Sequence, residues 1–295
     1  MSLQACAFFM HARKLYYKGD KTMFGERLEN VRKTSPLVHN ITNYVTVNDV
    51  ANVLLATGAS PIMSDEPLDV EDITSICGGL NINIGTLNQR TIEAMFIAGR
   101  KANELGHVVS LDPVGAGASK LRTETALKLM DEIDFDVIRG NISEIKTLVT
   151  GSGSTKGVDA DAADAVYEDN LDEMVSFVKK VSEKTGSIIA ITGAIDLVAD
   201  KDTCYVIRNG RPEMSKITGT GCQLSGLIPA FVAANPDDKL EAVAAAVSMM
   251  GVAGEIGWSN MAEGDGNSTY RNRIIDAIFN MDGETLNKNA KYEVK

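Results

Sequence analysis

A glycine-rich turn at residues 218–222, Thr-Gly-Thr-Gly-Cys, is the segment of this chain best suited to chemistry. Apolar residues follow it at three- and four-residue spacing, which predicts a helix that begins near Cys222: Leu224, Leu227, Ile228 and Phe231. Backbone N–H groups at such a helix start point toward a common centre, and the helix dipole adds partial positive charge. The turn therefore predicts an anion site with the Cys222 thiol beside it, biased toward thiolate. The alternative is a turn that only opens a helix, with a buried and inert cysteine.

Four further polar residues stand at or just after the ends of predicted strands: Asp112, Arg139, Glu144 and Thr192. Ligands bind at the carboxyl ends of the strands in open parallel sheets, so these residues are expected to share one rim with the turn at 218–222. Each also has a commoner role. Carboxylates often cap helices or lie on the surface, and Thr192 can be a turn residue.

Phosphoryl transfer is the chemistry that suits this set. Asp112 and Glu144 would hold Mg²⁺, directly or through water. Arg139 and the amides of residues 219–221 would neutralise phosphate oxygens, and Cys222 would receive the proton of the acceptor hydroxyl. Because an ordinary thiol has a pKa of about 8.5, its thiolate is a far weaker base than an alkoxide. It would accept the proton late, so positioning and charge stabilisation would carry most of the catalysis.

The elements that must position these residues alternate between strand and helix along most of the chain. Helices are predicted near residues 26–32, 47–55, 70–77, 91–105, 121–133, 142–149, 171–184, 222–234, 240–251 and from Asn267 or Ser268 to 279. Strands are predicted near 35–41, 59–63, 79–85, 107–112, 137–140 and 187–193. This alternation predicts an α/β fold with a parallel sheet covered on both faces.

The sheet is expected to end in antiparallel strands at 195–199 and 204–208, and Asn209-Gly210 predicts a tight hairpin leading to 211–216. The charged tail at 282–295 is expected to fray. Residues 151–157 are rich in glycine and serine but lack the spacing of a P-loop, so a surface loop is expected. Residues 1–22 are expected to be an extension or leader, and residues 23–295 a single domain.

Composition bounds the function. The net charge of −11 and the pI near 4.8 argue against a nucleic-acid or acidic-membrane partner. Four cysteines without a Cys-x-x-Cys pair and three histidines make a structural zinc site improbable. We expect a cytoplasmic protein, since no apolar run reaches the roughly twenty residues that span a bilayer and no secretory signal is evident.

Two other sets of residues have open roles. His39, Asn40 and Asn43 follow a short strand, where capping and turn duty is the usual fate of such residues and a ligand role stays open. Met63 ends another strand, and core packing is its plain alternative.

Eight short segments in this order resemble the hydroxyethylthiazole kinase family of thiamine biosynthesis. They are Ser-Pro-Leu-Val-His-Asn-Ile-Thr-Asn at 35–43, Gly-Ala-Ser-Pro-Ile-Met at 58–63, Asn-Ile-Gly-Thr-Leu at 83–87, Leu-Asp-Pro-Val-Gly-Ala-Gly at 111–117, Arg-Gly-Asn at 139–141 with Glu144, Lys-Gly-Val-Asp at 156–159, Ile-Thr-Gly at 191–193 and the turn at 218–222. No one of them is specific, but their order is.

The resemblance implies a ribokinase-like three-layer α/β/α fold with a mostly parallel central sheet and antiparallel edge strands. It also implies phosphorylation of 4-methyl-5-(2-hydroxyethyl)thiazole by ATP with Mg²⁺, in a homotrimer with active sites at subunit boundaries. The residue roles that it implies are thiazole contact by Met63 and Gly219, ATP contact by Arg139 and Thr192, metal binding by Asp112 and Glu144, and base catalysis by Cys222.

Two alternatives stay open from the sequence: a kinase of the same fold for another alcohol such as hydroxymethylpyrimidine, and a silent sensor that binds thiazole or nucleotide. One segment departs from the family pattern, since residues 264–270 read Gly-Asp-Gly-Asn-Ser-Thr-Tyr where a Gly-Pro-Gly-Ser-Phe-like turn is expected.

Overall fold

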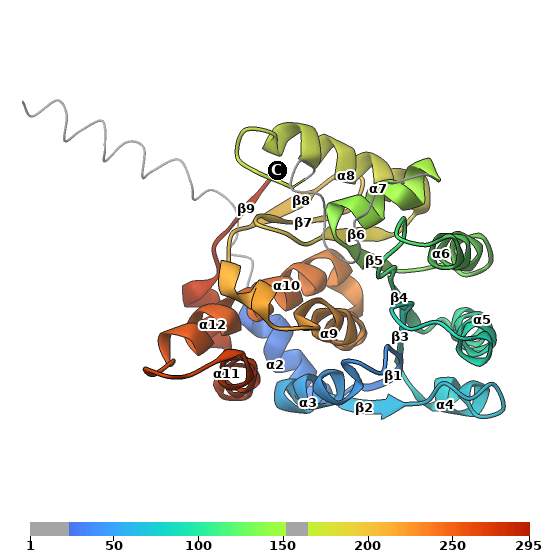
Figure 1. Ribbon diagram of the computed structural model, residues 1–295, viewed down its shortest axis with the longest axis horizontal. Helices are drawn as coiled ribbons and strands as arrows, with labels where there is room; N and C mark the ends of the chain where they lie inside the picture. The colour runs from blue at the N-terminus through green and yellow to red at the C-terminus, as the bar shows by residue number, and fades with distance from the viewer. Residues whose placement is uncertain (1–23, 152–164) are drawn as a thin grey trace, which may run out of the picture.

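The computed structural model describes residues 24–151 and 165–295. In these residues one nine-stranded sheet lies between two layers of helices (Figure 1), in the order β2-β1-β3-β4-β5-β6-β7-β8-β9. The six strands from β2 to β6 run parallel, and β7, β8 and β9 are antiparallel. The predicted three-layer fold with antiparallel edge strands is confirmed. The extension expected at 1–22 and the motif at 156–159 lie outside the described residues, as does most of the loop expected at 151–157.

The strands are short, and all except β9, where no strand was predicted, lie close to their predicted positions. They are β1 (Leu37–Ile41), β2 (Ser60–Met63), β3 (Gly79–Asn83), β4 (Val108–Asp112), β5 (Val137–Gly140), β6 (Ile188–Ile191), β7 (Asp196–Ala199), β8 (Cys204–Ile207) and β9 (Tyr292–Val294). Every residue of β3 and β4 is buried, because helices cover both faces of the sheet there.

The helices form two sets, each packed on one face of the sheet around its own hydrophobic core. One face is covered by α2 (Phe24–Thr34), α3 (Val47–Thr57), α9 (Thr220–Ala234), α10 (Lys239–Ser259), α11 (Asn267–Asn280) and α12 (Gly283–Asn289). The other is covered by α4 (Val70–Ile76), α5 (Gln89–Leu105), α6 (Lys120–Glu132), α7 (Ile142–Thr150) and α8 (Leu171–Thr185) (Figure 1). The 3₁₀ helix η2 (Pro212–Lys216) leads into α9.

A row of polar side chains crosses the sheet beneath α9. Asn40 and Asn81 lie opposite each other on β1 and β3, and the Asn81 Nδ2 donates to the Asn40 Oδ1 at 3.2 Å. Small residues let α9 approach this row, since a Cβ at Gly226 would lie 3.3 Å from the Asn40 Oδ1. The polar groups bond to one another, so they can be buried without losing their hydrogen bonds.

The hairpin predicted at Asn209-Gly210 is wrong. Pro212 opens η2 and has no N–H to give to a strand ladder. Asn209 instead ties the C-terminal segment to the fold, because its side chain donates to the Asn289 carbonyl at 2.9 Å and accepts from the Lys291 N–H at 2.7 Å. The strand that pairs with β8 is β9.

The prediction of a frayed tail at 282–295 is therefore also wrong, since the tail forms α12 and β9. The Tyr292 ring packs 4.4 Å from Phe24 and 5.9 Å from Tyr205, centroid to centroid. The helix α11 consequently is not the last, and Gly266 rather than Asn267 or Ser268 takes its N-cap position.

The helical stretch at 236–259, which contains α10, is long and apolar enough to cross a membrane by length and composition. It exceeds the predicted length of 240–251, but 78% of its most apolar window is buried inside the fold. This is the pattern of a core helix, and α10 indeed packs against α9 and α11.

Candidate active site

Asp112 is the centre of the polar residues at the carboxyl edge of the sheet. The register places it opposite Asn83, whose Nδ2 donates to the Asp112 Oδ2 at 2.7 Å. The Ser225 hydroxyl of α9 donates to the same oxygen at 2.8 Å, and the Arg139 Nη1 lies 3.6 Å away. The Asp112 Oδ1 is buried without a partner among the described residues. Burial raises the pKa of this carboxyl, against the opposing effect of Arg139.

Arg139 lies directly against the start of α9. A Cβ at Gly221 would come within 2.5 Å of its Nη1, so only glycine lets the guanidinium occupy this place. The Arg139 Nη2 donates to the Thr192 hydroxyl just past β6. Asp196, which accepts from the Gly193 N–H at 2.9 Å, also interacts with this cation, while burial raises the pKa of Asp196 to about 7. The guanidinium and the helix start thus form one positive centre.

Glu144 is held by backbone amides. Its two oxygens accept from the N–H groups of Gly115 and Asn141, each at 2.8 Å, and it completes a capping box at the start of α7. Burial, with a contribution from the nearby Asp112 charge, raises the pKa of Glu144 to about 7. The carboxylate therefore has the commoner role considered from the sequence, that of a helix cap. It also lies near Asp112.

Cys222 lies in the first turn of α9 and is 9% exposed. Its Sγ accepts a hydrogen bond from the Asn43 Nδ2 at 3.1 Å. Burial raises the pKa of the thiol, the Asp112 charge raises it further, and Arg139 opposes both. The bias toward thiolate expected from the helix start alone is therefore wrong, because desolvation outweighs it.

Gly219 and Met63 complete the predicted set. Gly219 is the N-cap of α9 with φ of 85°, and a Cβ there would lie 2.1 Å from the Thr46 Cγ2. Met63 ends β2 at the same edge of the sheet and packs, partly buried, against the core that includes Cys222. Hydrogen bonds and an ion pair link the thiol, through Asn43 and Asn83, to Asp112, Arg139 and Thr192, whereas Met63 lies at the margin.

Three residues of the site lacked an assigned role from the sequence: Asn43, Asn83 and Ser225. Asn43 had turn duty as its usual role, and its bond to Cys222 spans 179 residues of sequence. A signal existed for the other two. Asn83 ends its strand at the same level as Asp112, and Ser225 follows Cys222 by three residues and so shares its helix face.

The residues fit a magnesium ion that is shared with phosphates. Among the described residues no group of three or more His, Cys, Asp or Glu side chains could hold a metal by itself. Mg²⁺ is usually held by one or two carboxylates together with waters and substrate phosphates, and seldom by protein side chains alone. The unpartnered Asp112 Oδ1 and the adjacent Glu144 supply such carboxylates.

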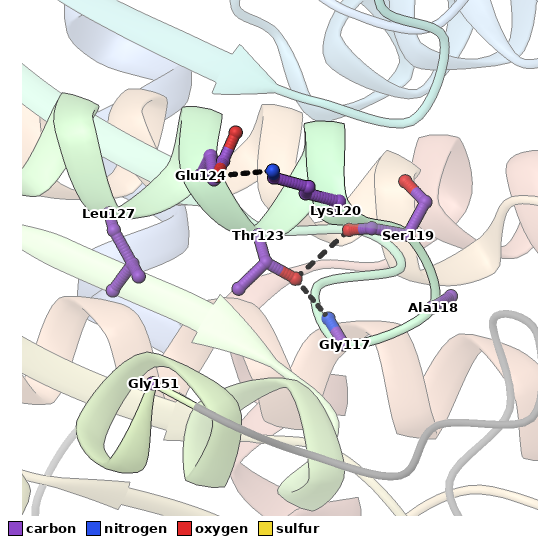
Figure 2. A pocket seen from close by; sticks show the side chains of 8 residues that line it. All are labelled: Gly117, Ala118, Ser119, Lys120, Thr123, Glu124, Leu127 and Gly151. Carbon is purple, nitrogen blue, oxygen red and sulfur yellow. Dashed lines mark hydrogen bonds and ion pairs between the residues drawn. The ribbon is translucent and has the colours of Figure 1, made fainter.

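A hollow of about 430 Å³ at the start of α6 lies apart from this set. Figure 2 shows that polar groups of its lining form hydrogen bonds with one another. The Thr123 hydroxyl accepts from the Gly117 N–H at 2.8 Å and donates to the Ser119 carbonyl at 3.0 Å. None of the predicted site residues lines it.

The model of the hydroxyethylthiazole kinase family matches residues 28–284. The chain belongs to this family. It is 62% identical to the hydroxyethylthiazole kinase of Clostridium acetobutylicum over 271 residues, which cover 92% of this chain and 99% of that protein. It is 46% identical to that of Clostridium tetani over 264 residues, with 90% and 95% covered.

Solved structures agree with this family. The hydroxyethylthiazole kinase protein of Pyrococcus horikoshii is 32% identical with a TM-score of 0.81, covering 92% of this chain and 98% of that one. A pyridoxal kinase of Staphylococcus aureus, 16% identical with a TM-score of 0.57 and 88% and 97% covered, shares the fold alone. The predicted family, ribokinase-like fold and phosphotransferase class are confirmed, and the pyrimidine-kinase and sensor alternatives are not favoured.

Proposed function

We propose that this chain phosphorylates the hydroxyl group of 4-methyl-5-(2-hydroxyethyl)thiazole, with ATP as the phosphoryl donor. The observation that supports this most directly is the hydrogen-bonded line from Cys222 through Asn43 and Asn83 to Asp112, with Arg139 at its side. It gathers a proton acceptor, a carboxylate and a cation at one helix start, which are the groups that phosphoryl transfer requires.

The phosphate groups of ATP would lie between Arg139 and the first amides of α9. Arg139 and Thr192 would contact ATP, and their mutual hydrogen bond holds the guanidinium in place. Asp112 and Glu144 would hold Mg²⁺, which when bound neutralises charge on the transferring phosphoryl group. The raised pKa values of both acids support this role, because a cation between them would relieve the cost of burying two like charges.

The alcohol would lie on the other side of the same helix start. Gly219 and Met63 would contact the thiazole, and Cys222 would take the proton from its hydroxyl oxygen as the new O–P bond forms. The thiolate is the form of Cys222 that can take this proton, and it is a far weaker base than an alkoxide, so that transfer must come late in the step. The main contribution of the protein is then to hold the hydroxyl in line and to stabilise charge.

Three finer points belong to the same proposal: the cation is Mg²⁺, the assembly is a homotrimer with sites at subunit boundaries, and the protein works in the cytoplasm. Exposed apolar side chains on the two loops beside the site support a subunit boundary there. Tyr44 is 75% exposed, Val45 60% and Leu68 93%. Tyr44 and Val45 are adjacent in the chain, and neighbouring exposed apolar side chains are more typical of an interface than of a free surface.

The test is direct. Purified protein, ATP, Mg²⁺ and the thiazole alcohol should yield the thiazole monophosphate and ADP in equal amounts, measured by liquid chromatography with mass detection. Hydroxymethylpyrimidine serves as the competing alcohol, and sedimentation velocity reports the assembly. A folded protein that is stabilised by the alcohol or by ATP yet transfers no phosphate would contradict the proposal.

A further inference from the structure

Asn43 holds a defined orientation next to the Cys222 thiol. Its Oδ1 accepts from the Thr46 N–H at 3.2 Å and from the Thr46 hydroxyl at 3.0 Å. A backbone N–H can only donate, so it fixes the oxygen on that side and turns the Nδ2 toward the sulfur. Both hydrogens of the Nδ2 are then used, one for the Cys222 Sγ and one for the Asn83 Oδ1, each at 3.1 Å.

Asn83 is oriented in the same way. Its Oδ1 also accepts from the Gly85 N–H at 2.9 Å, so its Nδ2 must face the Asp112 Oδ2, where it donates at 2.7 Å. The space around this pair is full, because a Cβ at Gly85 would lie 3.0 Å from the Asn83 Oδ1 and 3.1 Å from the Asn43 Nδ2. Neither amide can turn over without leaving a buried N–H group facing another donor.

We infer that Asn43 is a positioning residue of the phosphoryl transfer, which holds the Cys222 sulfur as a hydrogen-bond acceptor and so directs it to receive the hydroxyl proton. This inference rests on the proposed role of Cys222. A sulfur that accepts from Asn43 must point any S–H bond elsewhere, and it gains a donor that favours the thiolate, the form that can receive the hydroxyl proton. Asp112 and Arg139 are the charged groups that act on the same thiol, with opposite effects.

The variant Asn43→Asp removes this donor. Aspartate keeps the oxygen that accepts from Thr46 and has nearly the same shape, but an oxygen replaces the Nδ2 and a carboxylate charge is added, an addition that the control variant shares. We expect kcat to fall at least about tenfold, because a hydrogen bond to a charge is lost, with the KM for the alcohol within about threefold. Alkylation of Cys222 by iodoacetamide at pH 8, followed on its own peptide by mass spectrometry, should slow at least about fivefold.

The matched control is Asn81→Asp. Asn81 lies on β3, two residues before Asn83, and like Asn43 it is buried; its lost donor bond goes to Asn40 and not to the site. It should lower the melting temperature as Asn43→Asp does, yet leave kcat and the alkylation rate within about twofold. Equal losses in both variants would show that Asn43 is only structural and would overturn the inference.

A double-mutant cycle gives the second measure. In a Cys222→Ala background, Asn43→Asp should lower kcat by less than about twofold, because the group it positions is gone. Fully multiplying losses would overturn the inference. If Cys222→Ala itself keeps the wild-type kcat, the base role and with it this inference are overturned, while the phosphorylation activity of the chain stands. An unchanged alkylation rate in Asn43→Asp also overturns the inference.

Discussion

The variant Gly221→Ala is expected to disturb Arg139 in the site without disturbing α9, the helix that carries Gly221. The added Cβ would lie 2.5 Å from the Nη1 and 2.6 Å from the Nη2 of Arg139, whereas ordinary contact begins at 3.4 Å. The guanidinium must therefore move by about 1 Å, which weakens its interactions with Asp112 and Thr192. The obstacle is the far end of a flexible side chain, so the backbone of α9 need not move.

The expected loss follows from that displacement. A misplacement of about 1 Å in a group that orients phosphate costs about 100-fold, so kcat/KM for ATP should fall by about this factor, or about 2.7 kcal/mol. The helix itself should not be destabilised, since alanine is favoured over glycine in a helix by up to about 1 kcal/mol, so any fall in the melting temperature reflects the weakened Arg139 interactions. Steady-state kinetics with varied ATP, combined with a thermal melt, measures both quantities.

Gly226→Ala is the matched control in the same helix. Its Cβ would lie 2.6 Å from the Val50 Cγ1, in the core and away from Arg139. Overpacking of this kind costs about 1–3 kcal/mol, so its melting temperature should fall while kcat/KM stays within about threefold. In an Arg139→Ala background, Gly221→Ala should add little. Wild-type ATP kinetics for Gly221→Ala would refute the assignment of Arg139 to phosphate.

Three further predictions follow from the site and the tail. Cys222→Ala should lower kcat more than it raises the KM for the thiazole, and Cys222→Asp should retain activity because a carboxylate can take the same proton; a Cys222→Ala enzyme at wild-type rate removes the base role. The pKa of Glu144 is about 7, against 4.5 for an ordinary glutamate, so the folded state binds this proton more tightly than the unfolded state does. This difference contributes up to about 3 kcal/mol of stability below pH 4.5, and the contribution is lost as the pH rises through 7. Added Mg²⁺ should consequently raise the melting temperature more at pH 8 than at pH 6, and an equal rise at both would argue against Glu144 at the metal. Deleting residues 290–295 removes β9 and the Tyr292 ring, and should lower the melting temperature by roughly 5 °C with little effect on kcat; an unchanged melting temperature would show that this tail adds nothing to stability.

The fold was largely predictable because its signals are local. Periodicity of three and four residues marked α3 and α9, and the strand run at 107–112 ended at the polar Asp112. Parallel strands place their ends on one edge, so Asp112 and Thr192 could be assigned to a common rim without coordinates. The C-terminal segment failed this reasoning, since a short charged stretch has no periodicity and its strand exists only because β8 offers an open edge.

The sequence by itself determined the family and the three-layer fold, and it proposed the candidate site residues Asp112, Arg139, Glu144, Thr192, Gly219 and Cys222, whose roles stay predictions. Only the tertiary structure decided which groups touch. Ser225 reaches Asp112 across 113 residues, and Asn43 reaches Cys222 across 179. It also decided the direction of the thiol pKa, because a helix start favours the thiolate locally while the loss of water depends on everything packed around the sulfur.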